Sequence, residues 1–248
     1  MLAAPQPRVQ VLLGRFAALG TASVVIAVIT LLASAGPQRH RRLALISRRD
    51  ESGLDSLLSM DFARAVVLVE GVSDQLAVEA LAVRRGRRLD AEGISVVPIG
   101  GSKNIKTFLD KYGPQGLNVR LAGLYDAAEE GDFRRGLERA GLGSNLSRTD
   151  MERVGFYACV ADLEDELIRA LGAAAVEKVI EANGELDALR SFQRQPQWRG
   201  RSREAQLRRF FGTHSGRKIE SGALLIDALD LTRVPRPLDL VLAHLTLV

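Results

Sequence analysis

The stretch that decides the fold is Ala65-Val66-Val67-Leu68-Val69-Glu70-Gly71. Its first five residues are apolar, and the run is too short for a helix, so it predicts a strand that is buried on both faces. The acid and the glycine that follow end this strand. Apolar residues then recur at helical spacing until Gly86, after Ser73 and Asp74, which can cap a helix.

The same pattern of a strand followed by a helix repeats along the chain. Further strands are predicted at residues 94–99, 119–125 and 155–160, and the helices that follow them at 103–111, 131–140 and 163–171. Alternating strands and helices predict an α/β fold with a mostly parallel sheet flanked by helices.

No strand pattern follows Gly172, and the C-terminal part of the chain is expected to be helical. Helical spacing covers residues 173–189, 202–211 and 218–229, and a last apolar stretch follows Pro235-Arg236-Pro237. The sequence therefore predicts a poorly defined N-terminal extension at 1–60, an α/β domain at 61–172 and a helical, basic extension at 173–248.

The composition is that of a folded globular protein that can bury a sizeable core. Of the 248 residues, 46% are hydrophobic and 26% are charged, and the formal net charge is only +4. The single cysteine, Cys159, excludes an intramolecular disulfide and a zinc site of several cysteines. It lies within a predicted strand and is expected to pack as a small hydrophobic residue. Any metal is therefore expected to be held by carboxylates.

The N-terminal extension contains an apolar segment at residues 16–35. No charged residue lies between Arg15 and Arg39, so this segment is long enough for a membrane helix. Ala33-Ser34-Ala35 also resembles the cleavage site of an export signal. A later start of translation is the alternative. We expect a cytoplasmic protein, with a membrane anchor at 16–35 as the alternative.

Acidic residues follow three of the four predicted strands. The carboxyl ends of parallel strands meet at one edge of a sheet, where ligands gather. Carboxylates that converge there repel one another unless a cation lies between them, and Mg²⁺ is a cation that binds carboxylates and phosphate oxygens together. The acids nearest to the strand ends are Glu70, Asp74, Asp126, Glu129, Glu130, Asp162 and Glu164.

Each acid also has a purely structural interpretation. Asp74 can cap a helix, and the acids of residues 162–166 lie in a first helical turn, where the helix dipole favours negative charge. Glu70 is harder to explain in this way, because a carboxylate directly after five apolar residues loses hydration. We therefore expect Glu70 to be the central functional acid, followed by Asp126.

These acids occur in an order that resembles a known family. Val69-Glu70-Gly71 followed by Ser73-Asp74 resembles the first motif of topoisomerase-primase (Toprim) domains. Leu124-Tyr125-Asp126 matches the position of the Toprim Asp-x-Asp motif, and Asp162-Leu163-Glu164 resembles an element of the overcoming-lysogenization-defect (OLD) nucleases. The resemblance covers residues 64–171, and the helical extension is similar to that of small Toprim nucleotidyl transferase/hydrolase proteins.

The resemblance implies metal-dependent cleavage of nucleic acid, with DNA expected rather than RNA. It implies that Mg²⁺ or Mn²⁺ is bound by Glu70, Asp74, Asp126, Asp162 and Glu164. It further implies catalytic roles for Glu70 and for Lys218, which would stabilise charge on the phosphate. A primase-type nucleotidyl transferase and a non-catalytic nucleic-acid-binding module are the alternatives.

The sequence departs from the family pattern in two places. The second aspartate of Asp-x-Asp is Ala128, so one metal ligand comes from Glu129 or Glu130, from the later acids, or is missing. The chain also contains no Gly-x-x-x-x-Gly-Lys-Ser/Thr segment to bind a nucleotide phosphate, whereas OLD nucleases have an ATPase domain. Dependence on ATP would therefore require a separate ATPase.

Two further segments are candidates for contact with phosphate or nucleic acid. Gly100, Gly101 and Lys103 precede a predicted helix and suit a phosphate, although a plain turn explains them equally well. Between residues 190 and 218, arginines alternate with aromatic residues, which is typical of a nucleic-acid surface. The alternative is a solvated helix face with Phe210 and Phe211 in the core. The basic candidates are Arg199, Arg201, Arg208, Arg209 and Arg217.

Overall fold

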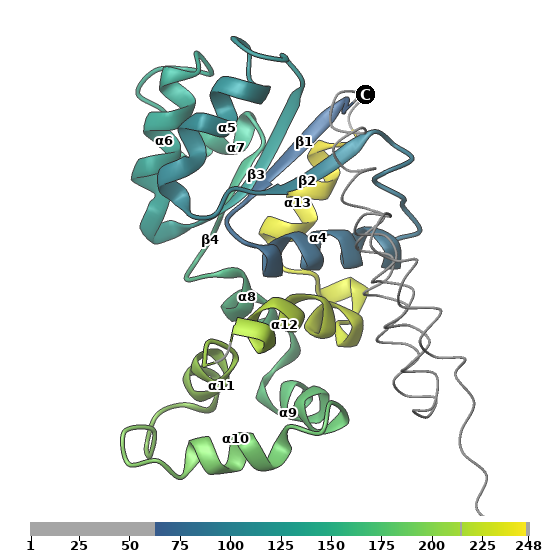
Figure 1. The fold of residues 1–248 in the computed structure, drawn as a ribbon, viewed down its shortest axis with the longest axis vertical. Helices are drawn as coiled ribbons and strands as arrows, with labels where there is room; N and C mark the ends of the chain where they lie inside the picture. Colours follow the sequence, from purple (N-terminus) through teal and green to yellow (C-terminus); the bar gives the residue numbers. More distant parts are fainter. Residues whose placement is uncertain (1–62, 214, 247–248) are drawn as a thin grey trace, which may run out of the picture. The chain divides into compact units, whose positions relative to one another are not determined.

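The computed structural model describes residues 63–213 and 215–246. Its centre is a four-stranded sheet with the strand order β2-β1-β3-β4, in which all neighbouring strands are parallel (Figure 1). The strands are β1 (Ala65–Val69), β2 (Ile94–Pro98), β3 (Arg120–Asp126) and β4 (Phe156–Cys159). The predicted α/β class and mostly parallel sheet are confirmed.

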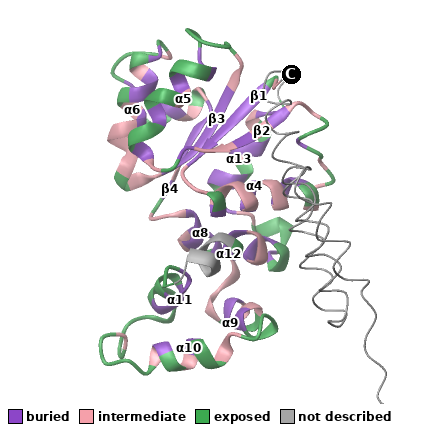
Figure 2. Ribbon diagram, in the orientation of Figure 1, coloured by how far each residue is buried: buried purple, intermediate pink, exposed green. Residues whose placement is uncertain are grey.

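The apolar run that decided the fold is buried along its whole length. Val66 and Leu68 of β1 pack into one hydrophobic cluster, whereas Ala65, Val67 and Val69 pack into another. Successive side chains of a strand point to opposite faces, so a strand covered on both faces requires apolar residues at every position. Figure 2 shows the strands buried between the helices.

Helices cover both faces of the sheet, as Figure 1 shows. On one face lie α5 (Ile105–Tyr112), α6 (Glu130–Arg139) and α7 (Arg148–Arg153). On the other lie α4 (Val72–Arg84) and α13 (Arg236–His244). Short 3₁₀ turns, η3 (Ser102–Asn104) and η4 (Ala127–Glu129), precede α5 and α6. Helix α7 was not predicted, because six residues are too few to display helical spacing.

The C-terminal extension is helical, as predicted. After α8 (Leu163–Leu171), the last helix before Gly172, it contains α9 (Ala173–Ala182), α10 (Leu186–Gln193), α11 (Arg203–Phe211), α12 (Ser215–Ala228) and η5 (Leu231–Arg233) before α13. The single helix expected at 173–189 is two helices, because Gly184 has a φ of 73° and ends the first one. The hydrophobic core continues across Gly172, since residues of β1, α9, α11 and α13 belong to one cluster.

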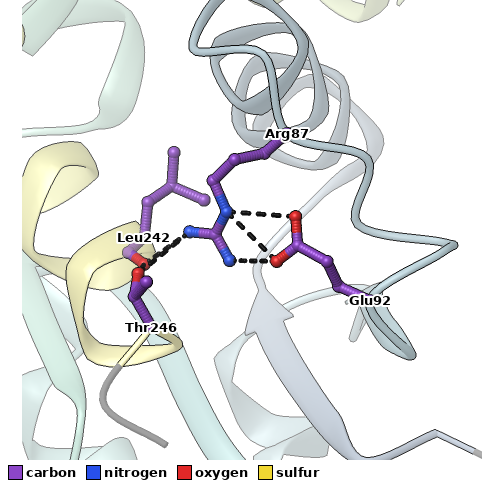
Figure 3. Close-up of polar contacts among 4 residues, drawn as sticks. All are labelled: Arg87, Glu92, Leu242 and Thr246. Atoms are coloured by element: carbon purple, nitrogen blue, oxygen red, sulfur yellow. Dashed lines mark hydrogen bonds and ion pairs between the residues drawn. The ribbon is translucent and has the colours of Figure 1, made fainter.

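Arginines at the end of α4 fix the last two helices of the chain. The Arg84 Nη1 atom donates to the carbonyl oxygen of Ile226, in the last turn of α12, and to that of Leu229, just beyond the end of this helix. Arg87 pairs with Glu92 and donates to the Leu242 carbonyl and the Thr246 hydroxyl, as Figure 3 shows. The carbonyl groups at the end of a helix lack intrahelical partners, so these contacts stabilise the ends of α12 and α13.

Within the described part of the chain, no helix is long and apolar enough to cross a membrane. The apolar segment predicted at 16–35 lies outside the described residues, so its role stays a prediction.

Candidate metal and nucleic-acid site

Glu70 follows β1 directly and lies at the carboxyl edge of the sheet. Its backbone is held by the loop after β2, where the N–H groups of Gly100 and Gly101 donate to the Glu70 carbonyl oxygen over 3.0 and 3.3 Å. These glycines have φ values of 71° and 109°, a region of backbone conformation that favours glycine. The two glycines therefore fix the backbone of the central acid, a use that the sequence did not indicate.

The start of α4 contributes Ser73 and Asp74. Gly71 is the N-cap of α4, and the Asp74 carboxylate accepts a hydrogen bond of 2.9 Å from the Gly71 N–H, so Asp74 caps the start of the helix from its first turn, as its structural interpretation predicts. The Ser73 hydroxyl donates to Glu164 Oε1 over 3.1 Å. This contact links α4 to α8, although their residues are far apart in the sequence.

The turn after β3 separates Glu129 from Glu130. Asp126 ends β3, and the 3₁₀ turn η4 places Glu129 near Glu70, where its carboxyl group raises the pKa of Glu70. Glu130 instead forms an ion pair with Arg148, with 2.5 Å between Oε2 and Nη2. Glu129 rather than Glu130 therefore joins the acidic group, a choice that the sequence had left open.

The acids influence one another's protonation. Burial, then the Glu129 carboxyl, then the charge of Asp126 raise the pKa of Glu70 from 4.5 to about 8. Burial and then the negative charge of Asp162 raise the pKa of Asp126 from 3.8 to about 7. Asp74 and Glu164 add to the repulsion at Asp126. The predicted acids of β1, β3 and α8 are therefore brought into one electrostatic group.

Two buried carboxylate oxygens of this group are candidate ligands for a cation. Glu70 Oε2 and Glu129 Oε2 are buried, and neither has a hydrogen-bond partner among the residues that the structure describes. A buried carboxylate oxygen without a partner costs free energy, which a divalent cation with oxygen ligands would recover. As they stand, no three acidic, histidine or cysteine side chains of residues 63–213 and 215–246 form a set that could hold an ion.

Asp162 is the N-cap of α8, as its structural interpretation predicts. Its Oδ1 atom accepts from the Asp165 N–H over 2.8 Å. Its other oxygen, Oδ2, contacts Arg208 of α11, with 2.6 Å to Nη2 and 2.7 Å to Nε. Glu164 is buried beside it at 6% exposure, while Asp165 pairs with Arg169 on the helix surface.

The candidate phosphate loop is already engaged within the protein. Lys103 is exposed and its Nζ atom lies 2.9 Å from Asp132 Oδ2, to which the Ser102 hydroxyl also donates. Because the N–H groups of Gly100 and Gly101 hold the Glu70 carbonyl, a phosphate at this loop would have to be bound by Lys103. Its role stays a prediction.

The aromatic residues of the basic segment form a core. Phe192 stacks on Trp198 with 5.1 Å between ring centroids and meets Phe210 edge to face at 5.8 Å. Phe210 and Phe211 are buried, so the interpretation of these rings as stacking platforms for bases is wrong. Exposed arginines remain on this part of the surface, including Arg199, Arg201 and Arg209.

Two predicted site residues lie where only the backbone is described. Arg217 and Lys218 belong to α12. This helix packs along α4, and a Cβ atom at Gly222 would come within 2.4 Å of the Ser73 carbonyl oxygen. The segment that contains Lys218 therefore lies in the helix that approaches the start of α4.

The sequence did not identify two contacts of the site. The bond from Ser73 to Glu164 and the ion pair of Asp162 with Arg208 join residues that are distant in sequence. From the sequence, only the charge of Arg208 is evident, and this charge predicts a contact with nucleic acid. Only the approach of α11 to α8 reveals that this charge contacts an acid of the group.

The electrostatic group predicts how pH and divalent metal act together on stability. The folded-state pKa values of Glu70 and Asp126, about 8 and about 7, lie above the free values of 4.5 and 3.8. Their contribution to the stability of the metal-free protein is complete below those free values and is lost as pH rises through 7 and 8. A metal binds the deprotonated form.

We therefore expect the rise in Tm caused by Mg²⁺, relative to EDTA, to be small at about pH 5.5 and to grow toward about pH 8.5. Thermal unfolding with Mg²⁺ and with EDTA at each pH measures the difference in Tm. The contributions of the other titrating groups cancel in this difference. A rise in Tm that is independent of pH would contradict these assignments.

Comparisons with known proteins agree with the fold. Residues 62–127 match the family described as overcoming lysogenization defect protein-like, TOPRIM domain. The C-terminal region of the Xanthomonas campestris pv. campestris OLD protein is 25% identical with a TM-score of 0.60, over 75% of this chain and 94% of that one. The corresponding region of the Burkholderia pseudomallei OLD protein is 22% identical with a TM-score of 0.58, over 74% and 97%. No curated protein matches the sequence.

Proposed function

We propose that this chain, which contains a Toprim domain of the OLD-like type, cleaves phosphodiester bonds of nucleic acid with the help of a divalent metal. The observation that supports this most strongly is the pair of buried, unpartnered oxygens of Glu70 and Glu129 at the carboxyl edge of the sheet. Most buried polar atoms of a folded protein have a partner, and two such carboxylate oxygens within one acidic group are typical of a metal site.

We propose Glu70, Asp74, Asp126 and Glu129 as the acids that hold Mg²⁺ or Mn²⁺. Glu129 would replace the second aspartate of Asp-x-Asp, which is the exposed Ala128. Asp162 and Glu164 would help to hold a second ion or orient a water molecule. A bound metal would supply positive charge at the phosphate and lower the pKa of an attacking water. The carboxylates would have to draw together to form the complete site.

The chain's own cations would bind and orient the nucleic acid. We propose that Lys218 stabilises charge on the phosphate, because α12 is held against the start of α4 at Gly222, one turn further along the helix. The exposed arginines of the helical extension would contact the phosphate backbone, which needs positive charge but no particular base. Lys103 would add a further phosphate contact.

We propose DNA as the substrate and the cytoplasm, where DNA is accessible, as the location. A separate ATPase is the proposed partner for any ATP-dependent step, since the sequence contains no phosphate-binding loop of the Gly-x-x-x-x-Gly-Lys-Ser/Thr type. Primase-type nucleotidyl transfer and a binding function without catalysis are the competing interpretations, and Ala128 favours the latter.

Incubation with supercoiled plasmid, single-stranded DNA and RNA tests the proposal. We expect nicked plasmid with Mg²⁺ or Mn²⁺ and intact plasmid with EDTA. Carboxylates alone supply no positive charge to stabilise the phosphate during cleavage. Incorporation of nucleotides on primed and unprimed templates would indicate transfer instead. Binding that requires no metal, with no substrate cleaved, would contradict the enzymatic function.

A further inference from the structure

Arg208 reaches from the helical extension into the acidic group. It lies on α11, and its Nε and Nη2 atoms both contact Asp162 Oδ2, at 2.7 and 2.6 Å. The charge of Asp126 also acts on Arg208, so the guanidinium lies within electrostatic reach of the acid that ends β3. A cation of the protein therefore occupies a position next to one of the proposed metal ligands.

This pair occupies Asp162 Oδ2, the oxygen that does not cap α8. Oδ1 caps α8 through the Asp165 N–H, and Oδ2 accepts both bonds from Arg208. The position of the carboxylate is fixed by the cap, since that bond belongs to the start of a helix. Only Oδ2 can change its partner without disturbing α8, and this change requires Arg208 to leave.

The pair lies at the edge of the site, where a change of partner costs little. The side chains of Arg208 and Asp162 are 44% and 25% exposed. Ion pairs at such exposure contribute little stability, because water and salt replace them readily. Arg208 has the planar fork that matches a phosphate, and the exposed Arg209 follows it on the same helix. A phosphate at the edge of the site would offer Arg208 a stronger partner.

We propose that Arg208 is a positioning residue that pairs with Asp162 in place of a metal and is released to a substrate phosphate when metal and nucleic acid bind. This inference rests on the proposed function. It adds that Asp162 is paired with Arg208 before a metal binds and is released from Arg208 afterwards. Arg208 and the metal compete for Asp162 Oδ2, whereas Arg208 and the metal cooperate once a phosphate is present. Loss of Arg208 therefore has opposite effects on metal binding and on cleavage.

The test compares the full-length variants R208Q and R208K with the wild type. In the absence of nucleic acid, the Mg²⁺ or Mn²⁺ concentration that gives half of the maximal rise in Tm should fall about two- to fivefold in R208Q. R208K retains the charge and should remain near the wild-type value. At saturating metal, R208Q should cleave plasmid at least about tenfold more slowly with a raised KM for DNA, and R208K should recover part of this loss.

R169Q is the matched control. Arg169 is 47% exposed and pairs with Asp165 and Glu166 on α8, so its replacement removes the same charge from a neighbouring ion pair but leaves Asp162 untouched. Metal titration and cleavage should match the wild type within about twofold. Circular dichroism of each variant establishes that it is folded.

The outcomes separate this proposal from the proposed function. A wild type whose Tm does not respond to either metal overturns the metal site and, with it, the role of Arg208. A wild type that responds, with R208Q needing the same metal concentration or more, overturns the competition alone. Unchanged cleavage in R208Q overturns the contact with the phosphate. The opposite effects on metal binding and cleavage would support the proposal.

Discussion

Replacement of Glu70 by Gln is expected to abolish metal-dependent cleavage while stabilising the metal-free protein. The amide keeps the shape of the side chain but removes the charge, so the loss of a central metal ligand should slow cleavage by about a thousandfold or more. In the metal-free protein at high pH, the same change removes a buried negative charge that Asp126 and Asp74 repel. Unfolding should then become less favourable by about 1 kcal/mol after allowance for screening by solvent.

Plasmid nicking and thermal unfolding of the E70Q variant measure the two effects. D110N is a suitable control, because Asp110 forms an exposed ion pair with Lys106 on α5 and should affect neither quantity strongly. The rise in Tm with Mg²⁺ should disappear in E70Q and persist in D110N. A variant that is inactive and also less stable at high pH would indicate that Glu70 has a structural role instead.

The fold and the central acids could be predicted because they depend on local sequence. Five consecutive apolar residues fit a strand covered on both faces, and β1 has these bounds. Glu70 and Asp126 end neighbouring strands, and parallel strands bring their carboxyl ends together whatever the loops do. Side-chain periodicity, together with the shared carboxyl edge of parallel strands, therefore locates an acidic site before any tertiary contact is known.

The remaining features depend on contacts between distant segments or on the geometry of a short turn. Ser73 meets Glu164, and Arg208 meets Asp162, only because α4, α8 and α11 pack together. The aromatic residues of the extension looked like a nucleic-acid surface, yet Phe210 is needed in the core between α10 and α11. Alternation of basic and aromatic residues cannot distinguish these uses, since both place the arginines in water.

Replacement of Glu129, in the turn after β3, by Gln is expected to slow metal-dependent cleavage strongly. Glu129 and Glu130 are adjacent acids, but η4 places the first beside Glu70 and the second against Arg148. If Glu129 replaces the missing acid at Ala128, its neutralisation should slow cleavage about a hundredfold and raise the metal concentration needed. It should also lower the pKa of Glu70, because the Glu129 carboxyl is the largest influence on that pKa after burial.

E130Q is the matched comparison, since it changes the same atoms one residue further along the chain. Its expected effect is the loss of an ion pair in which Arg148 is half exposed, worth about 1 kcal/mol or less, with cleavage within about threefold of the wild type. Plasmid nicking and metal titration of the two variants, side by side, decide between the two glutamates. Equal losses would show that the 3₁₀ turn does not select between them. A loss confined to E130Q would place the missing ligand on the residue that the structure pairs with Arg148, and the ligand set based on Glu129 would be wrong.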